Sequence, residues 1–225
     1  MNINFIERAM EGTLNRLSLD VLTSENLMRP DECGGIPLIY ATMYGNLSQI
    51  PREVLTAKNL LTPDTDGWMA LHHAAATCRL GCIPVEVLTT ENLLVKDIDG
   101  WTPLQFAAAN GCLDQVPTEV LTAENLLVRN DECTALHKAA AGGYLSQIPK
   151  NVLTIENLLV EDKDGRSVLS YAITQGDLLP LLGLDLPMKY KEFVGEDWWS
   201  QNQLALKDLC ELNRGEQNGS DIDIF

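Results

Sequence analysis

The sequence predicts an all-α solenoid of about six stacked helix-turn-helix units with short turn fingers. One observation is that nearly the same segment starts at Val21, Val54, Val87, Val120 and Val152, reading VLTSENLM, VLTAKNLL, VLTTENLL, VLTAENLL and VLTIENLL. A second is that these starts lie 33, 33, 33 and 32 residues apart. A fixed period of this size is typical of repeat architectures. A third is that turn, cap and proline signals follow in the same order in successive units.

The first half of a unit is clearest in residues 97–127. The segment DIDG at 97–100 has turn chemistry, because Gly accepts a positive φ and Asp bonds its own backbone. Thr102 followed by Pro103 is typical of a helix N-cap with proline at the first helical position. We therefore expect a helix over Pro103–Asn110, ended by Gly111.

The second half of the unit contains a proline, which disfavours an uninterrupted helix. Pro117 is expected to begin a new helix, with Glu119 in its first turn, where the helix dipole favours an acid. Thr122 can then cap a last short turn, AENLL. One unit cannot bury its own apolar face, so neighbouring units must stack. We expect Leu104 and Leu126 to be buried between units.

The segment DGWTPLQFAAANG resembles an ankyrin repeat, whose pattern runs D-x-x-G-x-T-P-L-H-x-A-A-x-x-G. The resemblance departs from the family in the second helix, where this chain has Ile-Pro or Val-Pro. Similar stretches are GGIPLIYATMYG (34–45), DGWMALHHAAATC (66–78), TALHKAAAGG (134–143) and, more weakly, DGRSVLSYAITQG (164–176).

The repeat pattern also predicts the domain organisation. An array is expected over residues 1–186, with units starting near residues 1, 29, 62, 95, 128 and 160. The first unit lacks its turn, and the turn before the fifth is one residue short. Residues 187–214 are expected to form a helical cap on the last repeat, or alternatively a docking helix for a partner. Residues 215–225 are expected to be a disordered acidic tail.

The charge balance limits the partners. The chain has 16 Lys and Arg against 32 Asp and Glu, a formal net charge of −16. Such a surface repels nucleic-acid phosphates and anionic lipids and favours a basic protein partner, although the acid can equally serve solubility alone. No basic start leads into an apolar signal core, and the longest apolar run, near Leu178–Leu184, is far shorter than the roughly 18 residues of a membrane span. We therefore expect a cytoplasmic protein with no nucleic-acid or membrane partner.

Motifs for metal, cofactor or small-molecule chemistry are not indicated. The DxDG segments at 64–67, 97–100 and 162–165 lack both end ligands of a calcium loop, so their Asp residues are expected to stabilise turns. The family resemblance implies that His72 and His137 tie neighbouring units together by hydrogen bonds, with Gln105 in the same place between them. Free, mostly packed thiols are expected for all six cysteines: Cys33, Cys78, Cys82, Cys112, Cys133 and Cys210.

The resemblance implies a non-catalytic scaffold that binds a protein partner through its turn tips and concave helix face. The alternatives are a self-associating structural protein, and an enzyme or a regulatory subunit of one. Trp68 and Trp101 follow DG in consecutive units and are expected to form one apolar patch, or alternatively to lie flat on neighbouring turns. The expected partner-binding residues are Asp66, Trp68, Thr77, Ile98, Asp99, Trp101, Asn110 and Arg166.

Overall fold

The computed structural model describes residues 3–65, 67–177 and 179–181. Asp66, the cap expected over 187–214 and the tail expected over 215–225 lie outside these residues. In the described part the chain is helical, without strands; its extended pairing is limited to three isolated bridges, Pro63–Met69, Arg129–Thr134 and Glu161–Ser167. The predicted fold class, a helical repeat solenoid, is confirmed.

Each of the first four units combines one long helix, two short 3-10 turns and one four-residue helix. The fifth unit has one 3-10 turn between its two helices, and the described part of the sixth has one long helix and one 3-10 turn. The long helices are α1 (Phe5–Glu11), α3 (Pro37–Met43), α5 (Ala70–Ala76), α7 (Pro103–Asn110), α9 (Ala135–Gly142) and α11 (Val168–Gln175). The short helices are α2 (Ser24–Leu27), α4 (Ala57–Leu60), α6 (Thr90–Leu93), α8 (Ala123–Leu126) and α10 (Ile155–Leu158). The 3-10 turns are η1 (Leu14–Arg16), η2 (Leu19–Val21), η3 (Leu47–Gln49), η4 (Arg52–Val54), η5 (Leu80–Cys82), η6 (Val85–Val87), η7 (Leu113–Gln115), η8 (Thr118–Val120), η9 (Leu145–Gln147) and η10 (Leu179–Leu181).

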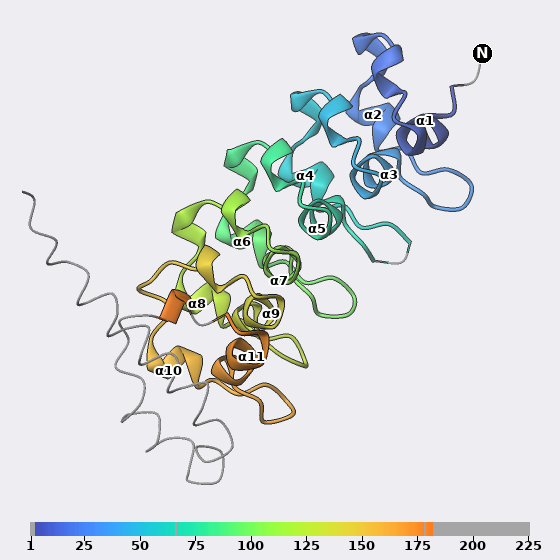
Figure 1. The fold of residues 1–225 in the computed structure, drawn as a ribbon. Coiled ribbons are helices and arrows are strands. Elements are labelled where there is room, and N and C mark those ends of the chain that lie inside the picture. Colours follow the sequence, from blue (N-terminus) through green and yellow to red (C-terminus); the bar gives the residue numbers. More distant parts are fainter. Residues whose placement is uncertain (1–2, 66, 178, 182–225) are drawn as a thin grey trace, which may run out of the picture.

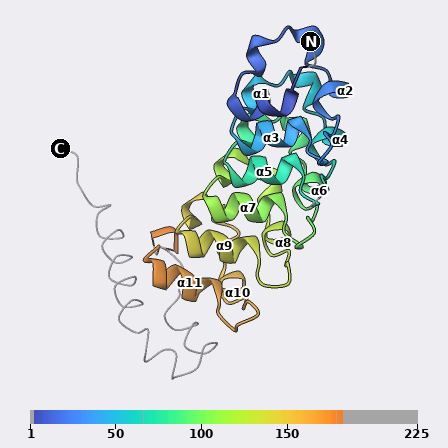
Figure 2. The same cartoon turned by 90° about the vertical axis from the view of Figure 1, so that its right-hand side faces the viewer.

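The long helices stack side by side in a single row (Figure 1). Loops that we call fingers project from one side of the row, and the short helices and 3-10 turns lie on the other. The second to sixth fingers comprise residues 29–36, 62–69, 95–102, 128–134 and 160–167. Figure 2 views the array from the finger side, where the long helices form successive rungs. We call this side the finger face.

The predicted helix over Pro103–Asn110 is confirmed in every detail. The Thr102 hydroxyl oxygen accepts a hydrogen bond from the Gln105 backbone N–H at 3.2 Å, and the Gln105 side chain accepts one from the Thr102 N–H at 3.1 Å. This reciprocal capping box satisfies two N–H groups that the first turn leaves unpaired. Pro103 stands at the first position, and Gly111 ends the helix with a φ of 71°.

The helix predicted to begin at Pro117 is only a short 3-10 turn in the structure. Pro117 is extended, with a φ of −54° and a ψ of 135°, and only the three-residue 3-10 turn η8 follows it. A proline disfavours the helical region for the residue before it, so Val116 is extended too and the chain cannot enter an α-helix there. The predicted Thr122 cap is confirmed, because its hydroxyl accepts from the Asn125 N–H at 3.2 Å and starts α8.

Glutamine side chains anchor this broken segment to the preceding unit. Gln147 donates to the Gly111 backbone oxygen at 2.7 Å and accepts from the Leu113 N–H at 2.8 Å. Gln49 donates to the Gly12 oxygen at 2.9 Å in the same way. These inter-unit bonds give the 3-10 turns partners that a continuous second helix would supply itself.

The core is a ladder of equivalent leucines. Leu104 and Leu126 are both fully buried, as predicted from the repeat. Their counterparts are equally buried in the other units: Leu38, Leu71, Leu136 and Leu169 on the long helices, and Leu27, Leu60, Leu93 and Leu158 on the short ones. Small alanines such as Ala107 and Ala108, fully buried on α7, let neighbouring long helices pack closely.

The expectation that all six cysteines are free thiols is wrong for two of them. Cys78 and Cys112 form a disulfide between the third and fourth units, with Cα atoms 5.4 Å apart. Cys78 has a φ of 55°, at the place where Gly45 and Gly111 end their helices. Its backbone therefore turns as a glycine would and brings its sulfur to the next unit. Of the other described cysteines, Cys33 and Cys82 are exposed free thiols and Cys133 is a buried one.

The inter-unit role implied for His72 and Gln105 is confirmed. His72 Nε2 lies 3.1 Å from the Val95 oxygen and 3.2 Å from the Trp101 oxygen of the following unit. Gln105 Nε2 donates to the corresponding oxygens of Val128 and Cys133, at 3.2 and 3.4 Å. Both side chains are buried.

Burial lowers the pKa of both His72 and His137, against the weaker opposing effects of nearby carboxylates and backbone oxygens. Both rings therefore bind a proton less readily in the folded array than in the unfolded chain, where histidine takes up protons below about pH 6.5. A lowered folded pKa means that stability is complete above that pH and falls as the solution is acidified. Each proton that the unfolded chain binds and the folded array does not lowers the free energy of unfolding by up to about 1.4 kcal/mol per pH unit.

We predict that the double variant His72→Gln and His137→Gln loses much of this pH dependence, because Gln105 fills the same place natively. Urea midpoints at pH 7.5 and pH 5.5 measure the effect. Between pH 7.5 and pH 5.5 the wild type should lose more stability than the variant does. Equal losses would mean that these histidines are not the groups that titrate. Asp162, with its pKa lowered to about 2, does not titrate in this window.

Candidate interaction surface

The fingers are built around a carboxylate or amide that folds the turn back on itself. Asp97 Oδ1 accepts from the backbone N–H groups of Asp99 at 3.0 Å and Trp101 at 2.8 Å. Asp162 does the same in the sixth finger, which confirms the predicted turn role of these residues. In the fifth finger, one residue shorter, Asn130 accepts from Glu132 at 2.9 Å and from Cys133 at 2.8 Å.

Consecutive fingers rest on one another through glycines. A Cβ at Gly34 would collide with the side chain of Thr65, and a Cβ at Gly67 would come within 3.1 Å of Ile98. Both glycines have positive φ values, 83° and 81°, which other residues rarely adopt. The second, third and fourth fingers are therefore closely packed against one another.

A row of aromatic side chains, which we call the aromatic row, runs along the finger face beside the finger loops. Its members are Trp68, His73, Trp101 and Phe106. The Trp68 ring stacks on His73 at 5.0 Å between centroids and lies 5.5 Å from Phe106, while Trp101 stacks on Phe106 at 5.1 Å. Phe106 thus joins the two indoles. All four side chains are partly buried.

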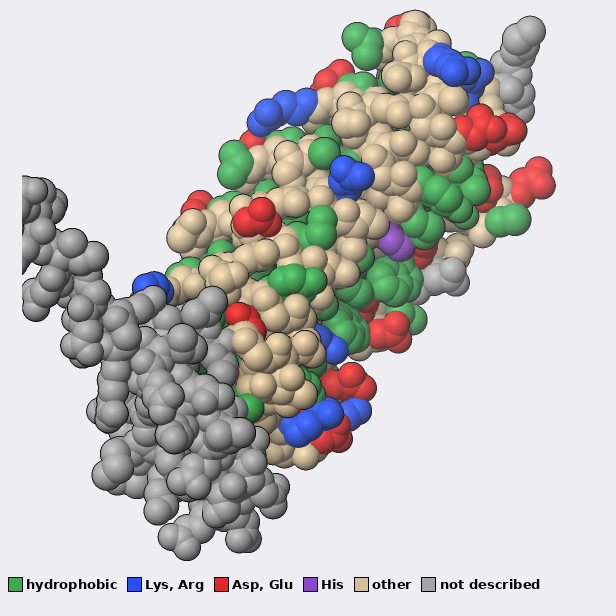
Figure 3. Space-filling model, in the orientation of Figure 1, with side chains coloured by type: hydrophobic (Ala, Val, Ile, Leu, Met, Phe, Trp, Pro, Cys, Tyr) green, Lys and Arg blue, Asp and Glu red, His purple; other side chains and the backbone are tan. Residues whose placement is uncertain are grey.

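Cations extend the aromatic row toward the C-terminal units. Lys138 Nζ lies 4.2 Å from the centre of the Trp101 ring, and the Arg166 guanidinium lies 5.0 Å from the centre of the Tyr171 ring. Ammonium and guanidinium groups are attracted to aromatic faces in this geometry. Figure 3 shows hydrophobic side chains gathered beside the fingers, with charged side chains at the finger ends.

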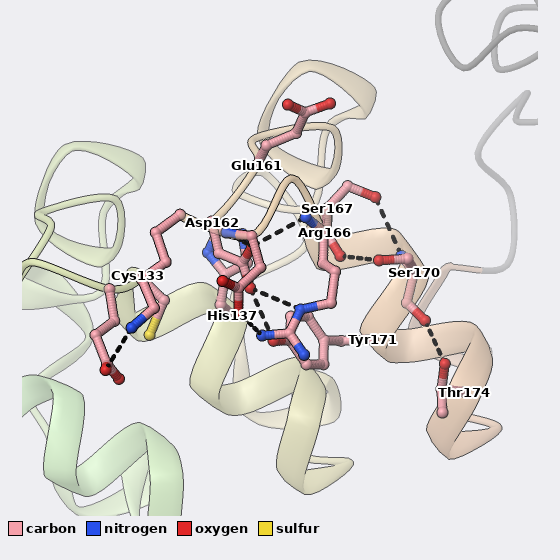
Figure 4. Close-up of polar contacts among 12 residues, drawn as sticks. Cys133, His137, Glu161, Asp162, Arg166, Ser167, Ser170, Tyr171 and Thr174 are labelled. Carbon is pink, nitrogen blue, oxygen red and sulfur yellow. Dashed lines mark hydrogen bonds and ion pairs between the residues drawn. The ribbon is translucent and has the colours of Figure 1, made fainter. Parts of the chain in front are cut away.

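The sixth finger carries the densest polar network of the face (Figure 4). Asp162 Oδ2 accepts from the Tyr171 hydroxyl at 2.8 Å and from Arg166 Nε at 3.1 Å, and Arg166 Nη2 bonds Asp164 at 2.6 Å. Burial alone would raise the pKa of Asp162, but the Arg166 N–H, the Tyr171 hydroxyl and the other donors lower it to about 2. Burial and the bond to Asp162 raise the pKa of Tyr171 to about 12.

Some acidic side chains at the finger tips form ion pairs with Lys or Arg, and others do not. Glu132 pairs with Lys163 at 2.8 Å, and Asp164 pairs with Arg166. The exposed carboxylates of Asp31, Glu32, Asp99 and Asp131 form no ion pair with any described residue. The second, fourth and fifth fingers therefore present acid that a basic surface could neutralise.

The expected partner-binding residues have different environments. Ile98, at the tip of the fourth finger, is 73% exposed. Thr77 is half-buried and donates to the His73 oxygen at 2.8 Å, and Asn110 is exposed and donates to the Phe106 oxygen at 2.9 Å. Asp99 and Arg166 are exposed, whereas Trp68 and Trp101 lie in the aromatic row.

Sequence reasoning missed the helix position that supports this row. It lies five residues after each finger tryptophan and is occupied in successive units by Tyr40, His73, Phe106, Lys138 and Tyr171. Aligning the units at this position would have shown a run of aromatic or basic residues. The position faces the finger loops and contributes the ring on which Trp101 and Arg166 lie.

The geometry defines a class, a helical repeat array with projecting fingers. Residues 38–118 match a family model described as ankyrin repeats in three copies. No protein with a curated description shows significant sequence similarity. Among solved structures, the ankyrin repeat domain of Bcl-3, a unique member of the IkappaB protein family, has a TM-score of 0.54 and 21% sequence identity, over 82% of this chain and 87% of that one. Residues 38–118 therefore match ankyrin repeats, and the wider array has the fold of an ankyrin repeat domain.

Two further findings concern the described residues alone. None of their helices is long and apolar enough to cross a membrane. No three of their His, Cys, Asp or Glu side chains are grouped so as to hold a metal ion.

Proposed function

We propose that this array is a non-catalytic scaffold that holds a protein partner against its finger tips and the aromatic row. Ankyrin repeats are generally protein-protein interaction modules. The observation that supports this use most is the combination of the exposed Ile98, the partly buried aromatic row behind it and unpaired acid at the tips. Apolar surface rimmed by charge is an interaction signature, and fingers that pack against one another lose less entropy on binding than free loops.

A basic partner surface fits this proposal best. Asp31, Glu32, Asp99 and Asp131 lie on one side of the molecule without a compensating cation among the described residues. The net charge of −16 would steer a basic partner toward the array and repel nucleic acid. A cytoplasmic location stays a prediction from the sequence, and the Cys78–Cys112 disulfide argues against it because reducing compartments keep thiols free.

We predict that Ile98→Ser weakens the partner at least about tenfold, or 1.4 kcal/mol, because it removes exposed apolar contact area without touching the core. Val85→Ser is the matched control, since Val85 is 64% exposed in η6, away from the fingers. A partner recovered on the immobilised wild-type array and eluted with salt would be titrated against both variants. Equal affinities of the two variants would remove the finger face from the proposal.

Trp101→Ala separates binding from packing. On the proposed function it costs about 2 kcal/mol or more of partner affinity and leaves the array folded, because the leucine ladder does not include this side chain. If the indole serves only to stiffen the fingers, the melting temperature falls and affinity follows it. Calorimetric melting and a partner titration on the same preparation distinguish the two results.

A further inference from the structure

The sixth finger is an internal example of how this repeat binds a guanidinium group. Asp162 is 8% exposed, and its Oδ2 accepts from Arg166 Nε and the Tyr171 hydroxyl. The same guanidinium bonds Asp164 and lies over the Tyr171 ring. Two carboxylates and an aromatic face thus surround one arginine side chain.

The fourth finger keeps the carboxylates and the ring but not the arginine. Asp97 and Asp99 stand where the sixth finger has Asp162 and Asp164, while Trp101 and Phe106 stand in place of Arg166 and Tyr171. Trp101 stacks on Phe106 at 5.1 Å, as Arg166 lies over Tyr171 at 5.0 Å. The indole therefore fills the equivalent place without supplying a donor or a charge there.

Asp97 is left incompletely satisfied as a result. The residue is 7% exposed, and its Oδ1 accepts hydrogen bonds from the two backbone N–H groups of the turn. Its Oδ2 is buried without a hydrogen-bond partner among the described residues. A buried carboxylate oxygen without a donor is costly, so a ligand that supplies one gains more than a surface ion pair would give.

The nearby cationic side chains do not donate a hydrogen bond to Asp97 Oδ2. Lys138 lies over the Trp101 ring, and Lys96 donates to the Arg129 backbone oxygen at 3.0 Å. Burial lowers the pKa of His72, the other titratable group facing Asp97, and its Nε2 is directed at the backbone oxygens of Val95 and Trp101. Asp99 beside it is exposed and unpaired.

We propose that the fourth finger binds an arginine side chain from a basic segment of the protein partner, with the guanidinium between Asp97, Asp99 and the Phe106 ring. The proposal rests on the proposed function and names the chemistry that its partner carries. Because Asp97 Oδ2 is covered in the free array, the Trp101 indole must move from Phe106 to the outer side of the guanidinium as it enters, where it still contacts the partner. Arginine fits better than lysine, since its planar fork can bond two carboxylates while stacking on a ring.

A hexa-arginine peptide at 150 mM salt is the probe, with hexa-lysine for comparison, titrated by calorimetry. Asp97→Asn tests the site, because Asn130 builds the same turn in the fifth finger and the variant should fold. Asp114→Asn removes the same charge from an exposed place in η7, away from the fingers. We expect the Asp97 variant to lose at least fivefold more affinity than the Asp114 variant. A smaller difference, or no binding by wild type, overturns the proposal.

Trp101→Arg provides a second, independent test. The new side chain would occupy the site from within, as Arg166 does, so hexa-arginine affinity should fall at least fivefold and the melting temperature should not. Undiminished peptide binding by this variant also overturns the proposal. A recovered partner that is sensitive to Ile98→Ser but not to Asp97→Asn would leave the proposed function standing and remove only the arginine site.

Discussion

Replacing Leu104 by alanine is expected to lower the free energy of unfolding by about 2–5 kcal/mol. The side chain is fully buried, and equivalent leucines on α5 and α9 are buried to the same degree. Neighbouring units pack these helices too closely to collapse into the space left, so a cavity remains. Urea unfolding followed by far-ultraviolet dichroism measures the loss.

Leu19→Ala is the matched control, because it deletes the same atoms from a side chain that is 75% exposed. Its effect should stay within about 0.5 kcal/mol. In a linear array each unit is stabilised mainly by its neighbours, so the Leu104 variant should also broaden the transition as the two ends uncouple. Equal midpoints for the two variants would contradict the leucine ladder.

The first half of each unit could be predicted because its signals are local. Thr102 and Pro103 define where α7 begins, and Gly111 defines where it ends, through bonds made within a few residues. Those interactions depend little on the rest of the fold. The stacking of units followed from the 33-residue period, since apolar residues recurring in phase must share one core.

The second half could not be predicted in detail because it depends on contacts between units. Pro117 indicated a break, but whether a helix or a 3-10 turn follows depends on what satisfies the freed backbone groups. Gln147 reaches back to Gly111 and Leu113 of the preceding unit to do so. Nothing in the local sequence around Gln147 indicates this partner, although the glutamine recurs two residues before the proline in several units.

Part of the candidate site could likewise be predicted from local sequence, and part depends on contacts between units. Trp68 and Trp101 were found because they follow DG in consecutive units. Their relation through Phe106 required the structure, because the ring belongs to the next helix rather than to the finger. The buried oxygen of Asp97 that lacks a hydrogen-bond partner was harder still to predict from the sequence. It shows only when the fourth finger is compared with the sixth, side chain by side chain.

The disulfide was missed although a spacing signal was present. Cys78 and Cys112 are 34 residues apart, one repeat plus one residue, so they lie on adjacent units. Cys78 also occupies a place where glycine ends the other long helices, which brings its side chain toward the neighbouring unit. Cysteines close together in the sequence are the wrong pairs to consider, because in a repeat array residues one period apart are neighbours.

Reducing this disulfide is expected to destabilise the array by about 3–4 kcal/mol, the chain entropy of a loop of this length. The bond joins the third and fourth units near the middle of the array, so its loss weakens the coupling between the two halves. In denaturant, a thiol reagent should titrate two fewer groups before reduction than after it. Urea midpoints with and without reductant give the change in stability.

Two substitutions separate the bond from the backbone at Cys78. Cys112→Ala should match the reduced wild type, because it removes the crosslink and leaves Cys78 at a φ of 55°. Cys78→Gly removes the same crosslink but relieves that conformation, which costs a residue with a Cβ about 1 kcal/mol. The glycine variant should therefore be the more stable of the two by roughly that amount. Equal thiol titres before and after reduction, with midpoints unmoved by reductant, would show instead that both sulfurs are free thiols.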